Sequence, residues 1–184
     1  MSARAAAYAV WALYGALTLF VFLLQLSLFP ALLPVRPMWL PLLPLIVAVL
    51  EGEWSGLWFG LAAGVLCDTV FFGTGVFYSV ALMLLSAAAG RHAGSLFSGK
   101  VAACAAICPA GVLLTGLLHF LFCQALPGRA GIAALWLIAA PEAAVTLLSA
   151  PLLFLPAWLI SRIRPAAKKR APRVPYRIKR YLRR

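Results

Sequence analysis

An all-α, polytopic membrane protein with about six transmembrane helices is the fold class that the sequence predicts, and composition is the first reason. Of the 184 residues, 65% are hydrophobic and only 11% are charged, and the mean hydropathy is +1.00. Soluble domains average about 45–50% apolar and about 25% charged residues, so this chain has too little polar surface for water. The other reasons are apolar segments near the length of a bilayer crossing and no strand-like alternation long enough for a barrel. The composition excludes soluble enzymes, disulfide-stapled secreted modules and disordered chains.

The first two apolar segments differ in length. Residues 5–29 follow Arg4 and end before Pro30. They are too long for the apolar region of a signal peptide, and no cleavage site of small residues follows, so we expect an N-terminal anchor. Residues 38–50 number only 13 and contain two prolines. This second segment is a re-entrant element, a tilted span or a span lengthened by its flanks.

Four further spans are predicted from apolar runs bounded by glycine, proline or charged residues, and they lie at 54–72, 76–89, 101–125 and 141–160. Pro141 at the first helical position and Glu142 in the first turn predict the start of the last span. Residues 132–140 before it are interpreted as an interfacial piece. These boundaries give one transmembrane domain over residues 1–160 and a cytoplasmic tail over residues 161–184.

The basic residues predict the orientation in the membrane. Eleven of the 16 Lys and Arg residues follow Ser161, whereas the chain up to Ile160 has five basic and four acidic residues. Six spans with the N-terminus inside place fourteen basic residues on the cytoplasmic side and leave only Arg36 and Arg129 outside. This distribution obeys the positive-inside rule, so we expect both termini in the cytoplasm.

Four glycines and an aspartate recur at intervals of four residues on the third span: Gly52, Gly56, Gly60, Gly64 and Asp68. Residues four apart share a helix face, so this spacing predicts a groove without side chains. Small-residue faces of this kind let another helix approach closely in lipid. The partner helix is either another helix of the same chain or the transmembrane helix of a separate protein.

Asp68 ends the predicted groove and has three interpretations. An acidic side chain deep in a span costs about 2.5–3.5 kcal/mol on insertion scales, so it should face protein or water. It caps or pairs locally, with Thr69, Thr74 or the N–H groups of residues 73–75; it binds a cation or proton; or it anchors a partner. Because the turn lies only five residues further on, the local role is favoured.

Polar side chains inside the predicted spans form a second set of candidates: Asp68, Thr115, His119, Glu142 and Thr146. The topology places the three ionisable ones toward the outer side of their helices. A shared polar cluster or a shallow outward-facing cavity is therefore one hypothesis. A single hydrogen-bonding role for each residue is the simpler one.

The tail carries a dense set of basic residues: Lys168, Lys169, Arg170, Arg173, Arg177, Lys179, Arg180, Arg183 and Arg184. After Pro175, apolar residues share one face of a short amphipathic segment. Such a segment binds anionic lipid or an acidic partner surface, and a topology anchor is the simpler interpretation. No nucleic-acid partner is expected, because the tail is tethered at the membrane and no RNA-binding fold accompanies it.

Motifs for catalysis are not found. The cysteines lie inside apolar segments without a C-x-x-C pattern, which is typical of small buried fillers. No phosphate-binding loop, H-E-x-x-H pattern or intramembrane-protease signature occurs. We therefore expect no enzymatic activity, no cofactor and no metal.

Residues 51–90, EGEWSGLWFGLAAGVLCDTVFFGTGVFYSVALMLLSAAAG, resemble the core of the rod shape-determining protein MreD family. That family has a glycine-spaced helix ending in an aspartate, a short glycine-containing turn and another apolar helix. The matching positions are Gly56, Gly60, Gly64, Asp68 and Gly75.

The C-terminal stretch PEAAVTLLSAPLLFLPAWLISRI is similar to the last helix of the same family, with Glu142 and Pro151 in matching places. The length and the helix count also agree. The long basic tail and the proline-containing segment 38–50 lie outside the resemblance.

The resemblance implies a non-enzymatic scaffold of the bacterial cell-wall elongation machinery in the inner membrane, where it maintains rod shape. Its implied partner is the bitopic protein MreC, bound through helix faces. The implied assembly also includes the actin-like MreB, the glycosyltransferase RodA and a class B penicillin-binding transpeptidase.

An alternative function follows from the same resemblance. The MreD family is similar in fold to the six-helix substrate-binding subunits of energy-coupling-factor vitamin transporters. Those subunits also dock through small-residue faces, so the glycine spacing does not distinguish the two. A vitamin site needs aromatic and polar groups that converge on a pocket, and the predicted outer loops offer few. A proton-coupled carrier would show two related halves, which the sequence lacks.

Overall fold

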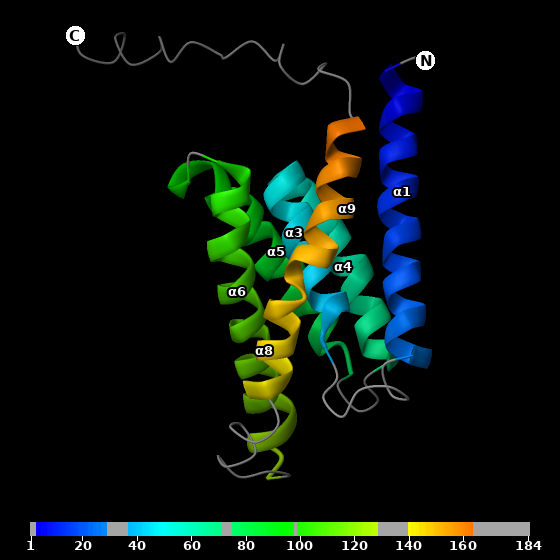
Figure 1. Ribbon diagram of the computed structural model, residues 1–184. Coiled ribbons are helices and arrows are strands. Elements are labelled where there is room, and N and C mark those ends of the chain that lie inside the picture. The colour runs from blue at the N-terminus through cyan, green and yellow to red at the C-terminus, as the bar shows by residue number, and fades with distance from the viewer. Residues whose placement is uncertain (1–2, 29–36, 71–74, 98, 129–139, 164–184) are drawn as a thin grey trace, which may run out of the picture.

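The computed structural model describes residues 3–28, 37–70, 75–97, 99–128 and 140–163 (Figure 1). All regular structure in these ranges is helical, so the all-α prediction is confirmed there. The elements are α1 (Ala3–Leu23), η1 (Leu24–Leu28), α3 (Trp39–Glu51), α4 (Glu53–Val70), α5 (Phe77–Leu96), α6 (Lys100–His119), η2 (Phe120–Ala125), α8 (Ala140–Leu148) and α9 (Ala150–Ile163). The η elements are short π-helical continuations of the helices before them.

Successive helices run in alternating directions along the bundle. In Figure 1, α1 starts at the end where α9 finishes, which we call the upper end, and α1 runs toward the lower end. Helices α3 and α5 run upward, whereas α4 and α6 run downward, and α8 and α9 together return to the upper end. The starts and finishes of the described chain therefore lie at one end of the molecule.

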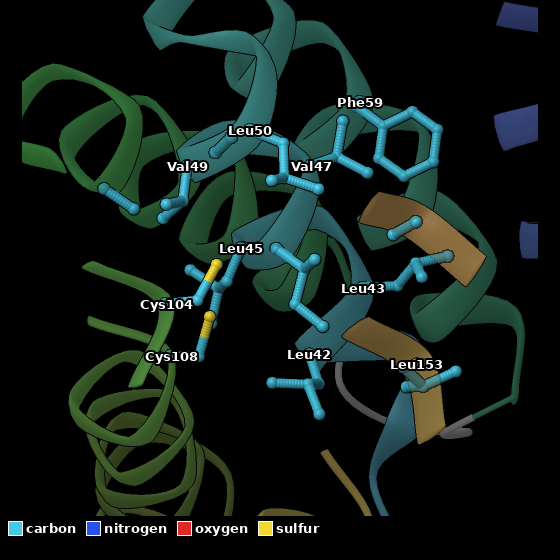
Figure 2. Packing of buried hydrophobic residues seen from close by; sticks show 14 of the residues in the cluster. Leu42, Leu43, Leu45, Val47, Val49, Leu50, Phe59, Cys104, Cys108 and Leu153 are labelled. Carbon is cyan, nitrogen blue, oxygen red and sulfur yellow. The ribbon is translucent and has the colours of Figure 1, made fainter. Parts of the chain in front are cut away.

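Helix α3 is the centre of the bundle. Every residue from Leu40 to Glu51 is buried, and α3 contacts α1, α4, α5, α6 and α9. Figure 2 shows its side chains reaching Cys104 and Cys108 of α6 on one side and Leu153 of α9 on another. A helix that is apolar all round must be surrounded, and this explains why the short second segment is so uniformly hydrophobic.

Side chains from other helices accept hydrogen bonds from the backbone N–H groups at the start of α3. The backbone N–H of Met38 donates to Thr146 Oγ1 at 2.8 Å, and that of Leu40 donates to Gln25 Oε1 at 3.1 Å. The first N–H groups of any helix lack partners within it, and leaving such a group unpaired in an apolar interior costs several kcal/mol. Gln25 and Thr146 thus make it possible for α3 to begin inside the protein.

The upper end of α3 also has partners. Lys100 Nζ donates to the carbonyl oxygen of Leu50 at 2.6 Å, which places a cation at the negative end of the helix. Glu51 is buried and accepts a hydrogen bond of 3.3 Å from the hydroxyl of Tyr14. The helix is 13 residues long, or about 20 Å, and both of its ends are held by side chains of other helices.

Two helices of the described chain are long and apolar enough to cross a membrane, Tyr8–Ser27 and Lys100–Ala125. A third crossing is reached if Ala140–Leu148 and Ala150–Ile163, which meet at 45°, count as one span. Large apolar side chains such as Leu23 and Leu159 remain more than half exposed on the outside of these helices. These features are consistent with a membrane protein, as the composition predicts.

Two boundaries differ from those expected. The span predicted at 76–89 continues as α5 to Leu96, because the small residues after Ala89 pack on α3 and α4 rather than forming a loop. The last segment is broken between α8 and α9. Pro151 explains the break, since it lacks an N–H group and its ring clashes with the carbonyl four residues earlier.

Candidate functional site

The glycine face of α4 packs against α5 of the same chain. A Cβ atom on Gly60 would lie 2.5 Å from the carbonyl oxygen of Leu82, and one on Gly64 would lie 2.5 Å from Ser79 Cα. A Cβ on Gly56 would meet both Ala48 of α3, at 2.5 Å, and the Ser86 carbonyl of α5, at 2.7 Å. These approaches leave no room for any side chain.

This packing identifies which of the two expected partners occupies the predicted groove. The face formed by Gly56, Gly60 and Gly64 is occupied by α5, so a separate protein cannot use it in this structure. Gly52 is not part of α4: it links α3 to α4 with a φ of +100°, a conformation that side chains disfavour. Its carbonyl carbon would lie 2.6 Å from a Cβ on Gly90, so it forms the upper end of the same contact.

Asp68 caps the first turn of α5. Its Oδ1 accepts the backbone N–H of Tyr78 at 2.9 Å, and its Oδ2 accepts the N–H of Ser79 at 2.9 Å and the Ser79 hydroxyl at 2.5 Å. A carboxylate at a helix N-terminus satisfies free N–H groups and interacts favourably with the helix dipole. The local interpretation of Asp68 thus fits, and these partners add to those expected. Of the expected ones, the Thr69 hydroxyl donates to the Leu66 carbonyl at 2.7 Å, and residues 73 and 74 lie outside the described residues.

Tyr78 connects the polar residues at the lower end. Its ring is fully buried and stacks on His119 of α6, with ring centroids 5.4 Å apart and planes inclined by 22°. Its backbone N–H donates to Asp68, so Tyr78 contacts both Asp68 and His119. The sequence prediction missed Tyr78, although its place ten residues after Asp68, at the start of the next helix, is the available signal.

His119 lies in an aromatic setting. Phe77 meets its ring edge to face at 6.0 Å, and Phe77 also lies 6.1 Å from Phe122. The Nδ1 atom of His119 is buried, and no hydrogen-bond partner for it occurs among the described residues. Asp68 and His119 thus meet at Tyr78, one through its backbone and one through its ring, whereas Glu142 lies in the first turn of α8.

Thr115 and Thr146 each donate a hydrogen bond to a carbonyl of their own helix. Thr115 donates to the carbonyl oxygen of Gly111, one turn earlier in α6, at 2.7 Å. Thr146 donates in the same way to the Glu142 carbonyl at 2.6 Å and accepts the Met38 N–H. Thr146 therefore joins α8 to the start of α3, a role that the sequence spacing does not reveal.

Two predictions remain, the basic tail and the absence of a metal site. The basic tail residues from Lys168 to Arg184 lie beyond Ile163, where the described chain ends. Within the described ranges, no group of three or more His, Cys, Asp or Glu side chains is arranged to hold a metal ion.

Comparisons with models of protein families, with curated proteins and with solved structures find no match to this chain.

Proposed function

We propose that the chain is a non-enzymatic scaffold of the bacterial cell-wall elongation machinery in the inner membrane. It would bind an MreC-like bitopic protein and act with MreB, RodA and a class B penicillin-binding transpeptidase. The proposal rests on the resemblance of residues 51–90 to the MreD family. In the described structure, the residues that carry this resemblance pack α4 against α5 and cap the start of α5.

The α4–α5 hairpin is the observation that supports the proposal best. Gly60 and Gly64 permit backbone contact between the two helices, and Asp68 joins the end of α4 to the start of α5. The residues with the family-like spacing thus form one compact unit, which supports the proposal. A unit of this kind gives a rigid element that presents its outer faces to a partner.

In the proposed topology, the chain crosses the membrane six times and both termini are cytoplasmic. The alternating helix directions support it, because they return the chain to the upper end after α9 (Figure 1). Arg91 and Lys100 also lie at the upper end of α5 and α6, as the positive-inside rule requires of a cytoplasmic side. The basic tail would then follow on that side, against anionic lipid.

The contact with the bitopic partner would lie on the outer face of α4, since its glycine face is occupied. Trp54, Trp58 and Val65 are 74%, 64% and 49% exposed there. Buried tryptophans dominate the binding energy of many interfaces, and their spacing presents them on one side of the helix. A partner helix that covered this face would remove two large rings from lipid.

Purification with a co-expressed MreC-like partner tests the proposal. Trp58→Ala should reduce co-purification strongly, because losing a central tryptophan costs about 2 kcal/mol or more, about 30-fold in affinity. Leu84→Ala on α5, where the side chain is 58% exposed, is the control and should leave recovery unchanged. Equal recovery of both variants would exclude this face of α4.

Mass spectrometry of the native-level protein in mild detergent distinguishes the alternative. Recovery of a single-span protein with a large outer coiled-coil domain, together with wall-synthesis enzymes, supports the scaffold. Recovery of a membrane coupling subunit with paired ATPases, or of a tightly held vitamin, would instead identify a transport subunit.

A further inference from the structure

An apolar groove runs between α6 and the α8–α9 pair, with α3 as its floor. Its volume is about 380 Å³. The residues that define it include Ile46, Cys104, Cys108, Pro109, Pro151 and Phe154. Cys108 is only 3% exposed at the base, whereas Ala105 and Pro151 are exposed at the rim, so the groove is open on one side.

The lining restricts what the groove can hold. All the lining side chains are aliphatic, aromatic, proline or thiol. A thiol is only a weak hydrogen-bond donor and acceptor, so the lining offers little to a polar ligand. A single flexible hydrocarbon chain fits this chemistry, and each CH₂ group that it buries contributes about 0.8 kcal/mol.

The α9 wall of the groove ends in a cation at the upper end of the molecule. Phe154, Trp158 and Arg162 follow one another at intervals of four residues, and the Arg162 guanidinium lies 4.2 Å from the centre of the Trp158 ring. Lys100, at the start of α6, lines a different pocket and donates to the Leu50 carbonyl of α3.

Arg162 forms no salt bridge with a carboxylate of the described residues, among which Arg91 pairs with Glu53. Its guanidinium has several N–H donors that its stacking on Trp158 does not use. Tryptophan and arginine side by side are typical of the headgroup level of a membrane.

We propose that the groove binds one anionic phospholipid, with an acyl chain between α6 and α9 and the headgroup beside Arg162 and Trp158. The apolar part of the site supplies affinity for any lipid chain of suitable size. Arg162 supplies the preference for a negative headgroup. This site depends on the membrane location of the protein and is independent of the proposed scaffold function.

Filling the groove tests the acyl-chain part. In native mass spectrometry of the full-length protein, with phosphatidylglycerol added at high salt to screen the tail, the wild type should retain one lipid. Ala105→Phe should weaken that binding about tenfold, because displacing even two methylenes has this effect. Ala106→Phe is the control, because Ala106 is equally exposed on α6 but does not line the groove.

Removing one charge tests the headgroup part. Arg162→Gln should weaken phosphatidylglycerol binding more than phosphatidylcholine binding, and so bring the two affinities close together. Arg91→Gln removes an equal charge at the same end of the molecule, from α5, and should preserve the preference. Equal affinities of the wild type for the two lipids would overturn the assignment of an anionic headgroup.

A third measurement needs no variant. Phosphatidylglycerol with a photoreactive group on its acyl chain should label residues 101–109 and 147–154 of the wild-type protein preferentially. Labelling spread evenly over all lipid-facing helices, α1 included, would overturn the groove as a site. Unchanged binding to Ala105→Phe with native helical content would do the same.

Discussion

At the residue scale, the carboxylate of Asp68 on α4 caps the N-terminus of another helix, α5. It accepts three hydrogen bonds from Tyr78 and Ser79, at 2.9, 2.9 and 2.5 Å. An aspartate in an apolar segment indicates either a functional charge or a structural one. Here both oxygens are used by the next helix, and this favours the structural role.

Asp68→Ala should lower the free energy of unfolding by about 1–2 kcal/mol, the usual effect of removing a cap. Asp68→Asn should lower the free energy of unfolding by less, because the amide oxygen still accepts one N–H and the NH₂ group can donate to the Ser79 hydroxyl. Unfolding in detergent measures both, with Thr69→Ala, on the exposed side of α4, as the control. An Asn variant with native stability and abnormal cell shape would show that the charge itself has a function.

His119 gives a second prediction at this scale. Its ring packs between Phe77 and Tyr78, while its Nδ1 is buried without a partner among the described residues. His119→Phe should therefore change stability by less than about 1 kcal/mol, since an apolar replacement of similar shape removes an unsatisfied group.

His119→Ala should cost about 2 kcal/mol or more, because it leaves a cavity between two rings. Thermal unfolding in detergent compares the two variants. A His119→Phe protein that folds normally and fails to support rod shape would assign chemistry, rather than packing, to the histidine.

At the element scale, glycine spacing predicted a close contact and left its partner open. The pattern at Gly56, Gly60 and Gly64 is a property of one helix, so it indicates that a backbone approaches without saying which one. The structure assigns the approach to α5. Chain connectivity explains the choice, because two helices joined by a short turn pack at once, at little loss of entropy.

Gly60→Ala should destabilise the protein by about 1–3 kcal/mol, because its Cβ would lie 2.5 Å from a rigid backbone carbonyl. Gly15→Ala on α1 is the matched control, since no atom lies within 4 Å of its Cβ position. That change should be neutral or stabilising by up to about 1 kcal/mol. Equal destabilisation of the two variants, measured by denaturant unfolding in detergent, would contradict the packing of α4 on α5.

At the scale of the whole molecule, the sequence predicted the helical class and the approximate place of each helix from apolar runs alone. The same runs could not predict that α3 is central, because a short apolar segment looks alike inside a bundle and across a bilayer. The hydrogen bonds that hold α3 come from Gln25, Lys100 and Thr146. Such pairings depend on tertiary contacts, so a pattern within one segment does not reveal them.

The orientation of the bundle gives a prediction at this scale. Ser95→Cys at the upper end and Pro127→Cys at the lower end place thiols at exposed positions. An impermeant maleimide added to spheroplasts should label Pro127→Cys directly and Ser95→Cys only after permeabilisation. The four native cysteines are buried, so the wild type is the blank. Labelling of both positions from the same side would contradict the proposed topology.

The way in which α3 is held also determines the order of assembly during synthesis. Its first N–H groups depend on Gln25, which is made before α3, and on Thr146, which is made more than 100 residues after it. Until the ribosome has added α8, the Met38 N–H therefore lacks its acceptor. A nascent chain that has completed α6 thus still has an unpaired N–H group at the start of its central helix. Chains released at that stage would be incomplete in the core, and proteases that remove incomplete membrane proteins would act on them.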